Sequence, residues 1–198
     1  MLAIFLDVET SGLDPFHHRV LEIAFKIVDV RTGEEKCSYQ SIVRQPLEVW
    51  EKRDPISVEI NGFTWEKLSR GKDEKEVSQA IIQLFTEHKI ERGKAVYICQ
   101  NPAFDRGFFA QLVDIYTQEQ RQWPYHWLDF ASMYWALQIK KINGDPNLFP
   151  TEMNLSKNAI AQQYQLPIES YPHSALNGVN HLILCYQTVV GFGVNATD

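Results

Sequence analysis

The sequence contains little cysteine. Its 198 residues include three, Cys37, Cys99 and Cys185. They lie far apart and form no CxxC pair, so their spacing indicates neither a disulfide framework nor a zinc site. The N-terminus lacks the basic segment of a secretory signal peptide, and acidic residues already enter at Asp7 and Glu9. Together these features predict a reduced, cytoplasmic location.

Long apolar runs and an excess of positive charge are also missing. The apolar run at residues 20–28 is interrupted by Glu22 and Lys26. A bilayer span needs about 20 apolar residues, so a transmembrane helix is excluded. The 19 Lys and Arg stand against 25 Asp and Glu, giving a net charge of −6. This balance argues against non-specific coating of nucleic acid, but it does not exclude a nuclease, because bound metal ions supply local positive charge.

What the sequence does have is the composition and the pattern of an α/β protein. Apolar residues make up 44% and charged residues 22%, and the length fits one domain, which we assign to residues 1–192, followed by a tail at 193–198. Apolar patterning predicts three strands and then alternating helices and strands, which indicates a mixed sheet with helices packed against it. The strands are expected at 2–9, 19–30, 37–44 and 94–99, and the helices at 73–88, 102–116, 129–142, 154–164 and 174–190. Residues 45–64, with two prolines, are expected to be irregular.

Two carboxylates stand at the end of the first expected strand. Residues two apart in a strand point to the same face, so Asp7 and Glu9 would lie side by side with Val8 turned into the core. A hard cation such as Mg²⁺ or Mn²⁺ suits such oxygen ligands. The alternative is a strand end emerging into solvent, where acids are common.

Asp105 and His173 are two further candidates. Asp105 stands in the first turn of a helix that Asn101 would cap and Pro102 would begin. The helix dipole also favours an acid there, so Asp105 alone does not identify a metal site. His173 follows Pro172 and precedes a helix, and histidine suits proton transfer near neutral pH. A loop histidine without a chemical role is the alternative.

Four segments taken together resemble the DEDDh exonuclease family. They are DVETSGL from Asp7, HRVLEIA from His18, NPAFD from Asn101 and YPHSAL from Tyr171. The family includes the proofreading subunit of bacterial DNA polymerase III, ribonuclease T and oligoribonuclease, and the resemblance covers almost the whole chain. It implies a ribonuclease H-like fold with a mixed five-stranded sheet flanked by helices. It also implies 3′→5′ release of nucleoside monophosphates from single-stranded DNA or RNA ends, using two divalent cations, Mg²⁺ or Mn²⁺.

The resemblance also implies roles for individual residues. Asp7 would bridge both metals, while Glu9 and Asp105 would each hold one of them. Glu9 would in addition orient the 3′ end, and His173 would take the proton from the attacking water. DNA and RNA stay open as substrates, and a homodimer and a polymerase partner stay open as assemblies.

Four more residues are expected to contact the terminal nucleotide. They are Thr10, Leu13, Phe63 and Asn101. Leu13 would act as an apolar wedge, and Phe63 would stack on a base, which typically contributes about 1–3 kcal/mol. Packing in the core is the alternative for both apolar side chains.

The sequence departs from the family pattern at Gly178. The pattern places an Asp five residues after the late His, and this chain has glycine there. Asn177 and Asn180 offer amide oxygens nearby but no negative charge. We therefore expect an exonuclease whose metal site is impaired or is completed by the substrate. The alternative is a weak or inactive module of the same fold that binds nucleic acid or a protein.

Overall fold

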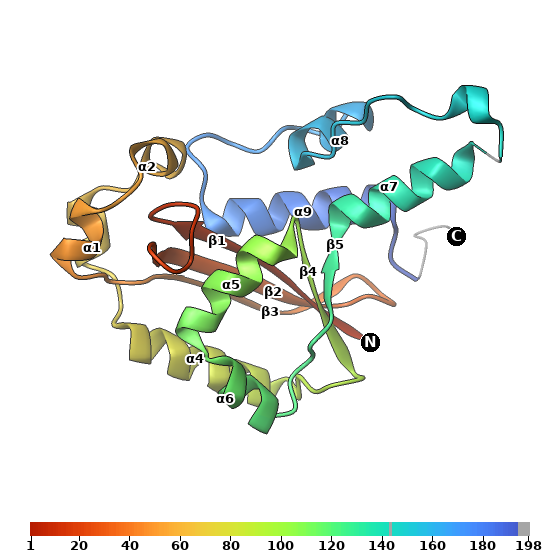
Figure 1. Ribbon diagram of the computed structural model, residues 1–198. Coiled ribbons are helices and arrows are strands. Elements are labelled where there is room, and N and C mark those ends of the chain that lie inside the picture. The colour runs from red at the N-terminus through yellow and green to blue at the C-terminus, as the bar shows by residue number, and fades with distance from the viewer. Residues whose placement is uncertain (143, 194–198) are drawn as a thin grey trace.

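A five-stranded sheet lies between two layers of helices (Figure 1). The computed structural model describes residues 1–142 and 144–193, so the predicted tail falls almost entirely outside the described residues. The strands are β1 (Leu2–Thr10), β2 (Val20–Asp29), β3 (Glu34–Ile42), β4 (Ala95–Cys99) and β5 (Trp127–Asp129), in the order β3-β2-β1-β4-β5. The first three form the predicted antiparallel meander, while β4 runs parallel to β1 and to β5. The predicted mixed five-stranded α/β sheet is confirmed.

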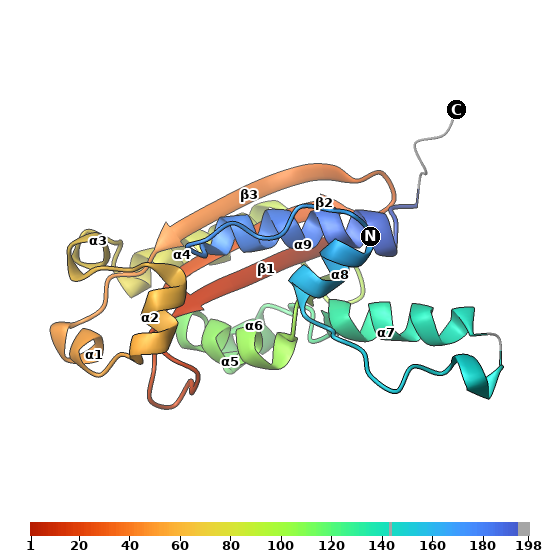
Figure 2. The ribbon, with the colours of Figure 1, turned by 90° about the horizontal axis from the view of Figure 1, so that it is seen from above.

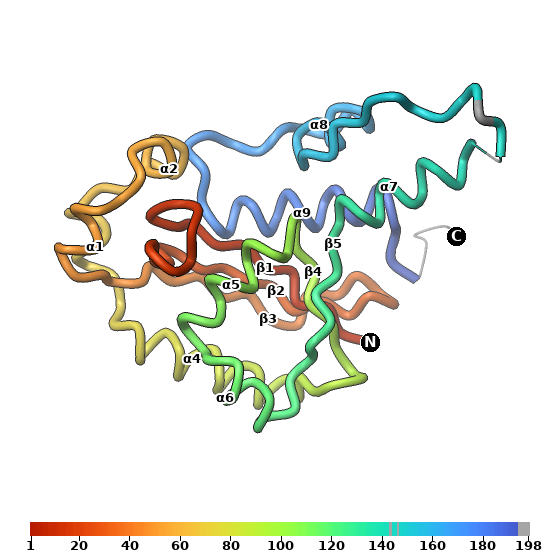
Figure 3. The backbone as a smooth tube through the Cα atoms, in the orientation of Figure 1, coloured from red at the N-terminus to blue at the C-terminus, as the bar shows by residue number. Residues whose placement is uncertain are grey.

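The helices cover both faces of this sheet (Figure 2). They are α1 (Leu47–Glu51), α2 (Pro55–Asn61), α3 (Trp65–Ser69), α4 (Glu74–Glu87), α5 (Pro102–Leu112), α6 (Ile115–Gln120), α7 (Phe130–Lys141), α8 (Lys157–Gln163) and α9 (Ala175–Val189), with a 3₁₀ turn η1 (Pro146–Leu148). Helices α4 and α5 pack on one face, and α7, α8 and α9 contribute to the core on the other. The tube in Figure 3 shows that α8 lies close to α9. In the part of the chain described, no helix is long and apolar enough to cross a membrane.

The side chains of β1 alternate between the two cores. Ile4, Leu6 and Val8 are buried toward α4 and α5, whereas Ala3 and Phe5 are buried toward α9. This period of two is the ordinary geometry of a strand buried on both faces. It directs the residues that follow Phe5 on its own face toward α9.

The expectation that residues 45–64 are irregular was wrong. The short helices α1 and α2 occupy much of this stretch, with Pro46 directly before α1 and Pro55 as the first residue of α2. Proline disrupts a helix interior but is well suited to the first turn, where no intrahelical partner is lost. Asp54 caps α2, accepting a hydrogen bond from the backbone N of Ile56 at 2.9 Å. The two prolines therefore mark helix starts.

The expected extent of the helix after Pro102 was also wrong. Helix α5 ends at Leu112, and Asp114 caps a separate helix, α6, by accepting from the backbone N of Thr117 at 3.0 Å. Tyr116, which was expected on the inner face, lies in α6 and is 81% exposed. A new cap two residues beyond the helix end changes the direction of the chain, so helical spacing does not continue across it.

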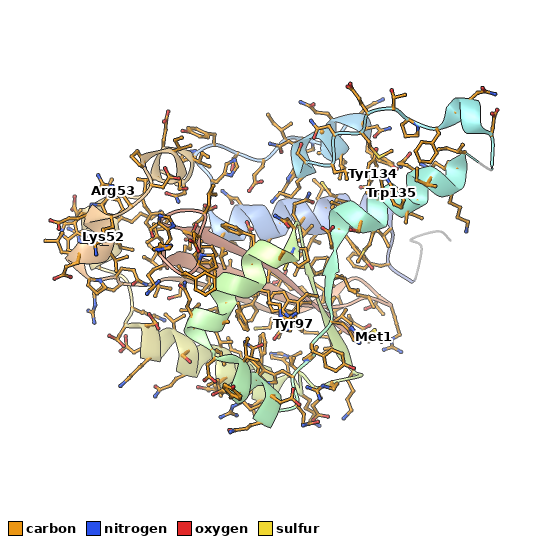
Figure 4. The ribbon with its side chains drawn as sticks, in the orientation of Figure 1. Met1, Lys52, Arg53, Tyr97, Tyr134 and Trp135 are labelled. Carbon is orange, nitrogen blue, oxygen red and sulfur yellow. The ribbon has the colours of Figure 1, made fainter. Side chains whose placement is uncertain are left out.

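Phe85 on α4 anchors the core beneath β1 and β2. It is fully buried, and its ring centroid lies 5.2 Å from that of Phe25 and 4.7 Å from that of Trp123. Tyr97 of β4, labelled in Figure 4, belongs to the same aromatic group at 6.2 Å.

We expect Phe85→Ala to lower the free energy of unfolding by about 3–5 kcal/mol, because it removes a buried ring from a tightly packed site. Urea denaturation followed by fluorescence measures this difference. Tyr116→Ala is the matched control and should change the free energy by less than about 0.5 kcal/mol. Equal effects of the two substitutions would contradict the packing described here.

Candidate active site

Asp7 and Glu9 lie in β1 on the face that α9 covers, and Val8 between them is buried on the opposite face. Glu9 is 9% exposed and pairs in register with Glu22 of β2. The Glu22 carboxylate accepts hydrogen bonds from the backbone N of Ala175 at 2.9 Å and from Gln40 Nε2 at 2.8 Å. It therefore fixes the first turn of α9 beside the carboxyl end of β1. The predicted orientation of the two β1 carboxylates is observed.

Asp105 approaches the same region from the neighbouring strand. Because β4 is parallel to β1, both strands end at the same edge of the sheet, and α5 starts three residues after β4. Asp105 lies in the first turn of α5 and is only 4% exposed. Burial raises its pKa well above the ordinary value, and the charge of Asp7 raises it further.

The negative charges of the three carboxylates repel one another. Burial raises the pKa of Glu9 to about 8, with further contributions from the charges of Asp7 and Glu22. Burial also raises the pKa of Asp7 to about 6, although the ammonium of Lys157 opposes the shift. Buried carboxylates that repel one another hold protons unless a cation neutralises them. Asp7, Glu9 and Asp105 therefore form one carboxylate cluster, drawn from two distant segments of the chain.

Lys157 and Glu169 lie beside the carboxylate cluster, and the sequence analysis connected neither of them with it. Lys157 Nζ lies 2.9 Å from Glu169 Oε2 and donates to the carbonyl oxygen of Gly178 at 3.2 Å. Both side chains are buried, at 11% and 5% exposure. Burial lowers the pKa of Lys157, but the charges of Asp7 and Glu169 outweigh it, so the net shift is upward. The two residues stand twelve positions apart, across the end of α8, and no motif links them.

Gly178 marks the point where Asp7, Glu169 and α9 meet. A Cβ atom at this position would collide with the Asp7 carboxylate and would lie 3.1 Å from Glu169 Oε1. Glycine therefore allows the carboxylate to approach the helix backbone. Neither asparagine takes the place of the missing acid: Asn180 is exposed, and Asn177 Nδ2 donates to Ser170 Oγ at 3.0 Å.

Helix α2 holds the segment of His173 against the end of β1. The backbone N of His173 donates to the carbonyl of Ile60 at 3.0 Å, and Asn61 Nδ2 donates to the carbonyl of Thr10 at 3.0 Å. Gly62 ends α2 with φ 64°, and a Cβ there would press on Pro172 at 2.9 Å. Glycine is thus required both by the left-handed backbone and by the close approach. The half-buried His173 is held beside the strand that carries Asp7 and Glu9.

The four expected nucleotide contacts have different surroundings. Leu13 is 71% exposed, which excludes core packing for it. Thr10 is buried and donates from Oγ1 to the carbonyl of Gly12 at 2.7 Å. Asn101 precedes α5 as predicted, but it has φ 66° and its exposed side chain makes no capping bond.

Phe63 is packed in the protein interior, which was the alternative to stacking on a base. It is 3% exposed within an apolar cluster that includes Leu21, Trp50 and Leu68. Lys67 Nζ lies 4.1 Å from the centre of its ring. The ring is thus covered on all sides and is not presented to a base. We correct its expected stacking role, because Trp50 of helix α1 and Leu68 of helix α3 bury it against β2.

The carboxylate oxygens of the cluster are ligands of the kind that a divalent cation prefers. The side chains as they stand, however, are not arranged around a metal site. Oxygen ligands of this kind suit Mg²⁺ and Mn²⁺, and their mutual repulsion calls for positive charge. Among the described residues, however, no three His, Cys, Asp or Glu side chains form a group that could hold a metal ion as they stand. The cation that Asp7 and Glu169 face is the ammonium of Lys157.

Comparisons with known proteins agree with this architecture. Escherichia coli exonuclease I bound to a dT13 oligonucleotide is similar in structure, with a TM-score of 0.72 and 18% identity over 95% of this chain and 41% of that chain. The zinc-bound form of the same enzyme with single-stranded DNA gives 0.71 and 17%, over 95% and 40%. A 3′-exonuclease that recognises the histone mRNA stem-loop gives 0.67 and 15%, over 97% and 83%. The chain spans about two fifths of the length of exonuclease I.

The sequence comparisons match the chain to a family but to no individual curated protein. No curated protein matches the chain. The sequence model of the exonuclease family RNase_T matches residues 4–179, which include every member of the carboxylate cluster, His173 and Gly178. The resemblance to exonucleases and the predicted ribonuclease H-like fold are confirmed. The chain therefore belongs to the exonuclease family RNase_T.

Proposed function

We propose that the protein is a metal-dependent 3′→5′ exonuclease that releases nucleoside monophosphates from single-stranded ends. The observation that carries this proposal is the convergence of Asp7, Glu9 and Asp105 at one edge of the sheet, beside the segment of His173. Buried, mutually repelling carboxylates destabilise a fold, so their presence in one cluster is best explained by a charge that they bind.

Asp7, Glu9 and Asp105 would hold the divalent cation, Mg²⁺ or Mn²⁺. When bound, such a cation stabilises the negative charge that develops on the phosphodiester oxygens. His173 would accept the proton of the attacking water, since its segment is held by α2 next to the end of β1 and an imidazole is suited to general base catalysis. Exposed Leu13 would lie against the terminal nucleotide, with the side chain of Asn101 also free to contact it.

A groove along the edge strand β3 offers a route for the rest of the substrate. It encloses about 530 Å³ and carries the basic residues Lys67, Arg70 and Lys72. A hollow of about 360 Å³ shares Lys67 with it and extends to Glu22 and Ser174, next to the carboxylate cluster. Cationic side chains leading to the cluster would neutralise phosphates of a single strand. The DNA-bound and RNA-recognising neighbours support a nucleic-acid substrate of this form.

A second function, binding without cleavage, is favoured by a specific observation. Lys157 already gives Asp7 a positively charged neighbour, and Gly178 supplies no carboxylate. A site neutralised from within would bind metal weakly and cut slowly. Nuclease assays on the following variants distinguish the two functions.

We expect Asp7→Asn to reduce cleavage of a labelled single strand in Mn²⁺ to less than about one hundredth of the native rate. Even residues that only support a metal ligand typically contribute 10–100-fold, and Asp7 is expected to be a ligand. The control is Asp145→Asn, the same change at an exposed acid, which should retain the native rate. Full activity of the Asp7 variant would remove this residue from the site.

His173→Ala should slow cleavage by about 10²–10⁴-fold while leaving Mn²⁺ affinity unchanged, because a general base acts on water and does not hold the cation. Single-turnover rates and calorimetric Mn²⁺ titration measure the two quantities separately. His126→Ala, at an exposed position, is the control. A loss of Mn²⁺ affinity that matches the loss of rate would contradict a role in proton transfer.

Gly178→Asp should raise Mn²⁺-dependent cleavage by about tenfold or more, because it returns a carboxylate to the motif position. Both this variant and Gly178→Ala add a Cβ that displaces the Asp7 carboxylate, but only the aspartate adds charge. Initial rates on a 3′-labelled strand compare the two. If both variants change the rate equally, the missing charge is not what limits activity.

A further inference from the structure

Glu22 of β2 is a buried acid that has no part in the proposed chemistry. It is only 2% exposed and lies directly opposite Glu9 in the strand register. Burial is the main reason that the pKa of Asp7 and that of Glu9 are raised, and the negative charge of Glu22 adds to both shifts. A buried acid that is repelled by its neighbours needs hydrogen-bond donors of its own.

One of these donors is the backbone at the start of α9. The Glu22 carboxylate accepts from the backbone N of Ala175 at 2.9 Å, and Gln40 Nε2 donates to its other oxygen at 2.8 Å. Ala175 is the first residue of α9, and the N–H groups of a first turn have no partner within their own helix. The Ser174 side chain accepts from one of them, and Glu22 accepts from that of Ala175. Glu22 therefore completes the cap of α9 from a different element of the fold.

His173 lies between this contact and a second attachment. Its own backbone N donates to the carbonyl of Ile60 in α2 at 3.0 Å. Two residues further along the chain, Ala175 is held by Glu22 at the start of β2, which lies beside the end of β1 because the two strands are antiparallel. The backbone of His173 is thus fixed to α2 on one side and to the sheet on the other.

We propose that Glu22 is a positioning residue: by holding Ala175, it fixes the backbone that places the imidazole of His173 for proton transfer. The inference rests on the proposed function for the chemical role of His173, but not for its placement. A general base must lie within hydrogen-bond reach of the group that it deprotonates, and a displacement of about 1 Å can slow a reaction by about 10²-fold.

Two substitutions separate the hydrogen bond of Glu22 from its charge. Glu22→Gln and Glu22→Met both remove the negative charge and keep a side chain of similar length. The Gln amide oxygen still accepts from Ala175, and its amide nitrogen donates to Gln40 once the Gln40 amide is turned round. The Met thioether is only a weak acceptor. A difference between the two variants therefore reports the hydrogen bond.

The first measurement is amide hydrogen exchange of the full chain, followed by NMR without metal or nucleic acid. We expect the amides of Ala175 and His173 to exchange at least about tenfold faster in Glu22→Met than in Glu22→Gln, because loss of the contact frees both. Asp114→Ala, which removes the cap of α6, is the control and should leave both amides as in the native protein. Equal exchange at His173 in the two Glu22 variants would overturn the inference.

The second measurement is the single-turnover rate of cleavage of a labelled single strand at saturating Mn²⁺. Glu22→Met should be slower than Glu22→Gln by at least about tenfold, at an unchanged KM, because the contact places a base and does not bind the strand. In a His173→Ala background the two substitutions should give equal rates, since a residue that acts through His173 has no effect once the imidazole is gone. A difference that persists in that background would overturn the inference.

Gln40→Met keeps the inference testable if Glu22→Met does not fold. It removes the donor to the second carboxylate oxygen and leaves Glu22 in place. Amide exchange at Ala175 and His173 should then be about threefold faster than in the native protein, because the carboxylate is held less firmly. Native exchange at both amides would count against the inference.

These results are distinguishable from a failure of the proposed function. If the native protein degrades neither single-stranded DNA nor RNA, but Glu22→Met loosens His173 and Glu22→Gln does not, the placement of His173 by Glu22 stands and the exonuclease proposal falls. If the native protein degrades these strands and the two Glu22 variants cut equally fast, only the inference falls.

Discussion

The repulsion among buried carboxylates is the constraint on which the rest of this site depends. Asp7, Glu9 and Asp105 come from a strand and from the first turn of a helix, and burial makes each of their charges costly. A fold keeps such a group only if something positive is held nearby. In this structure the ammonium of Lys157 provides part of that charge, and it opposes the upward shift of the Asp7 pKa.

The scaffold around the cluster consists of elements tied to one another at the end of β1. Glu22 accepts from the first turn of α9, and Asn61 connects α2 to the backbone of Thr10. Through Ile60, α2 also holds the segment that carries His173. The end of β1 and the backbone of His173 are therefore held by hydrogen bonds between segments more than 50 residues apart. These hydrogen bonds hold the segment of His173 next to the end of β1.

Gly178 lies within the part of the chain that the family model matches. The fold and the family assignment hold across residues 4–179, and TM-scores near 0.7 persist at identities below 20%. The family fold is thus kept with glycine at position 178, where the Asp7 carboxylate lies against the helix backbone.

The sequence by itself determined the first four strands, the major helices, the face shared by Asp7 and Glu9, and the absence of an acid at position 178. These features depend on local periodicity and on motifs of adjacent residues. It did not determine the helices between residues 45 and 64, the end of α5 or the burial of Phe63, because each depends on caps and on partners from elsewhere in the chain. Only the tertiary structure brought Lys157 and Glu169 to Gly178. Their interaction arises from the packing of α8 against α9, and such long-range electrostatic contacts leave no periodic signal in the sequence.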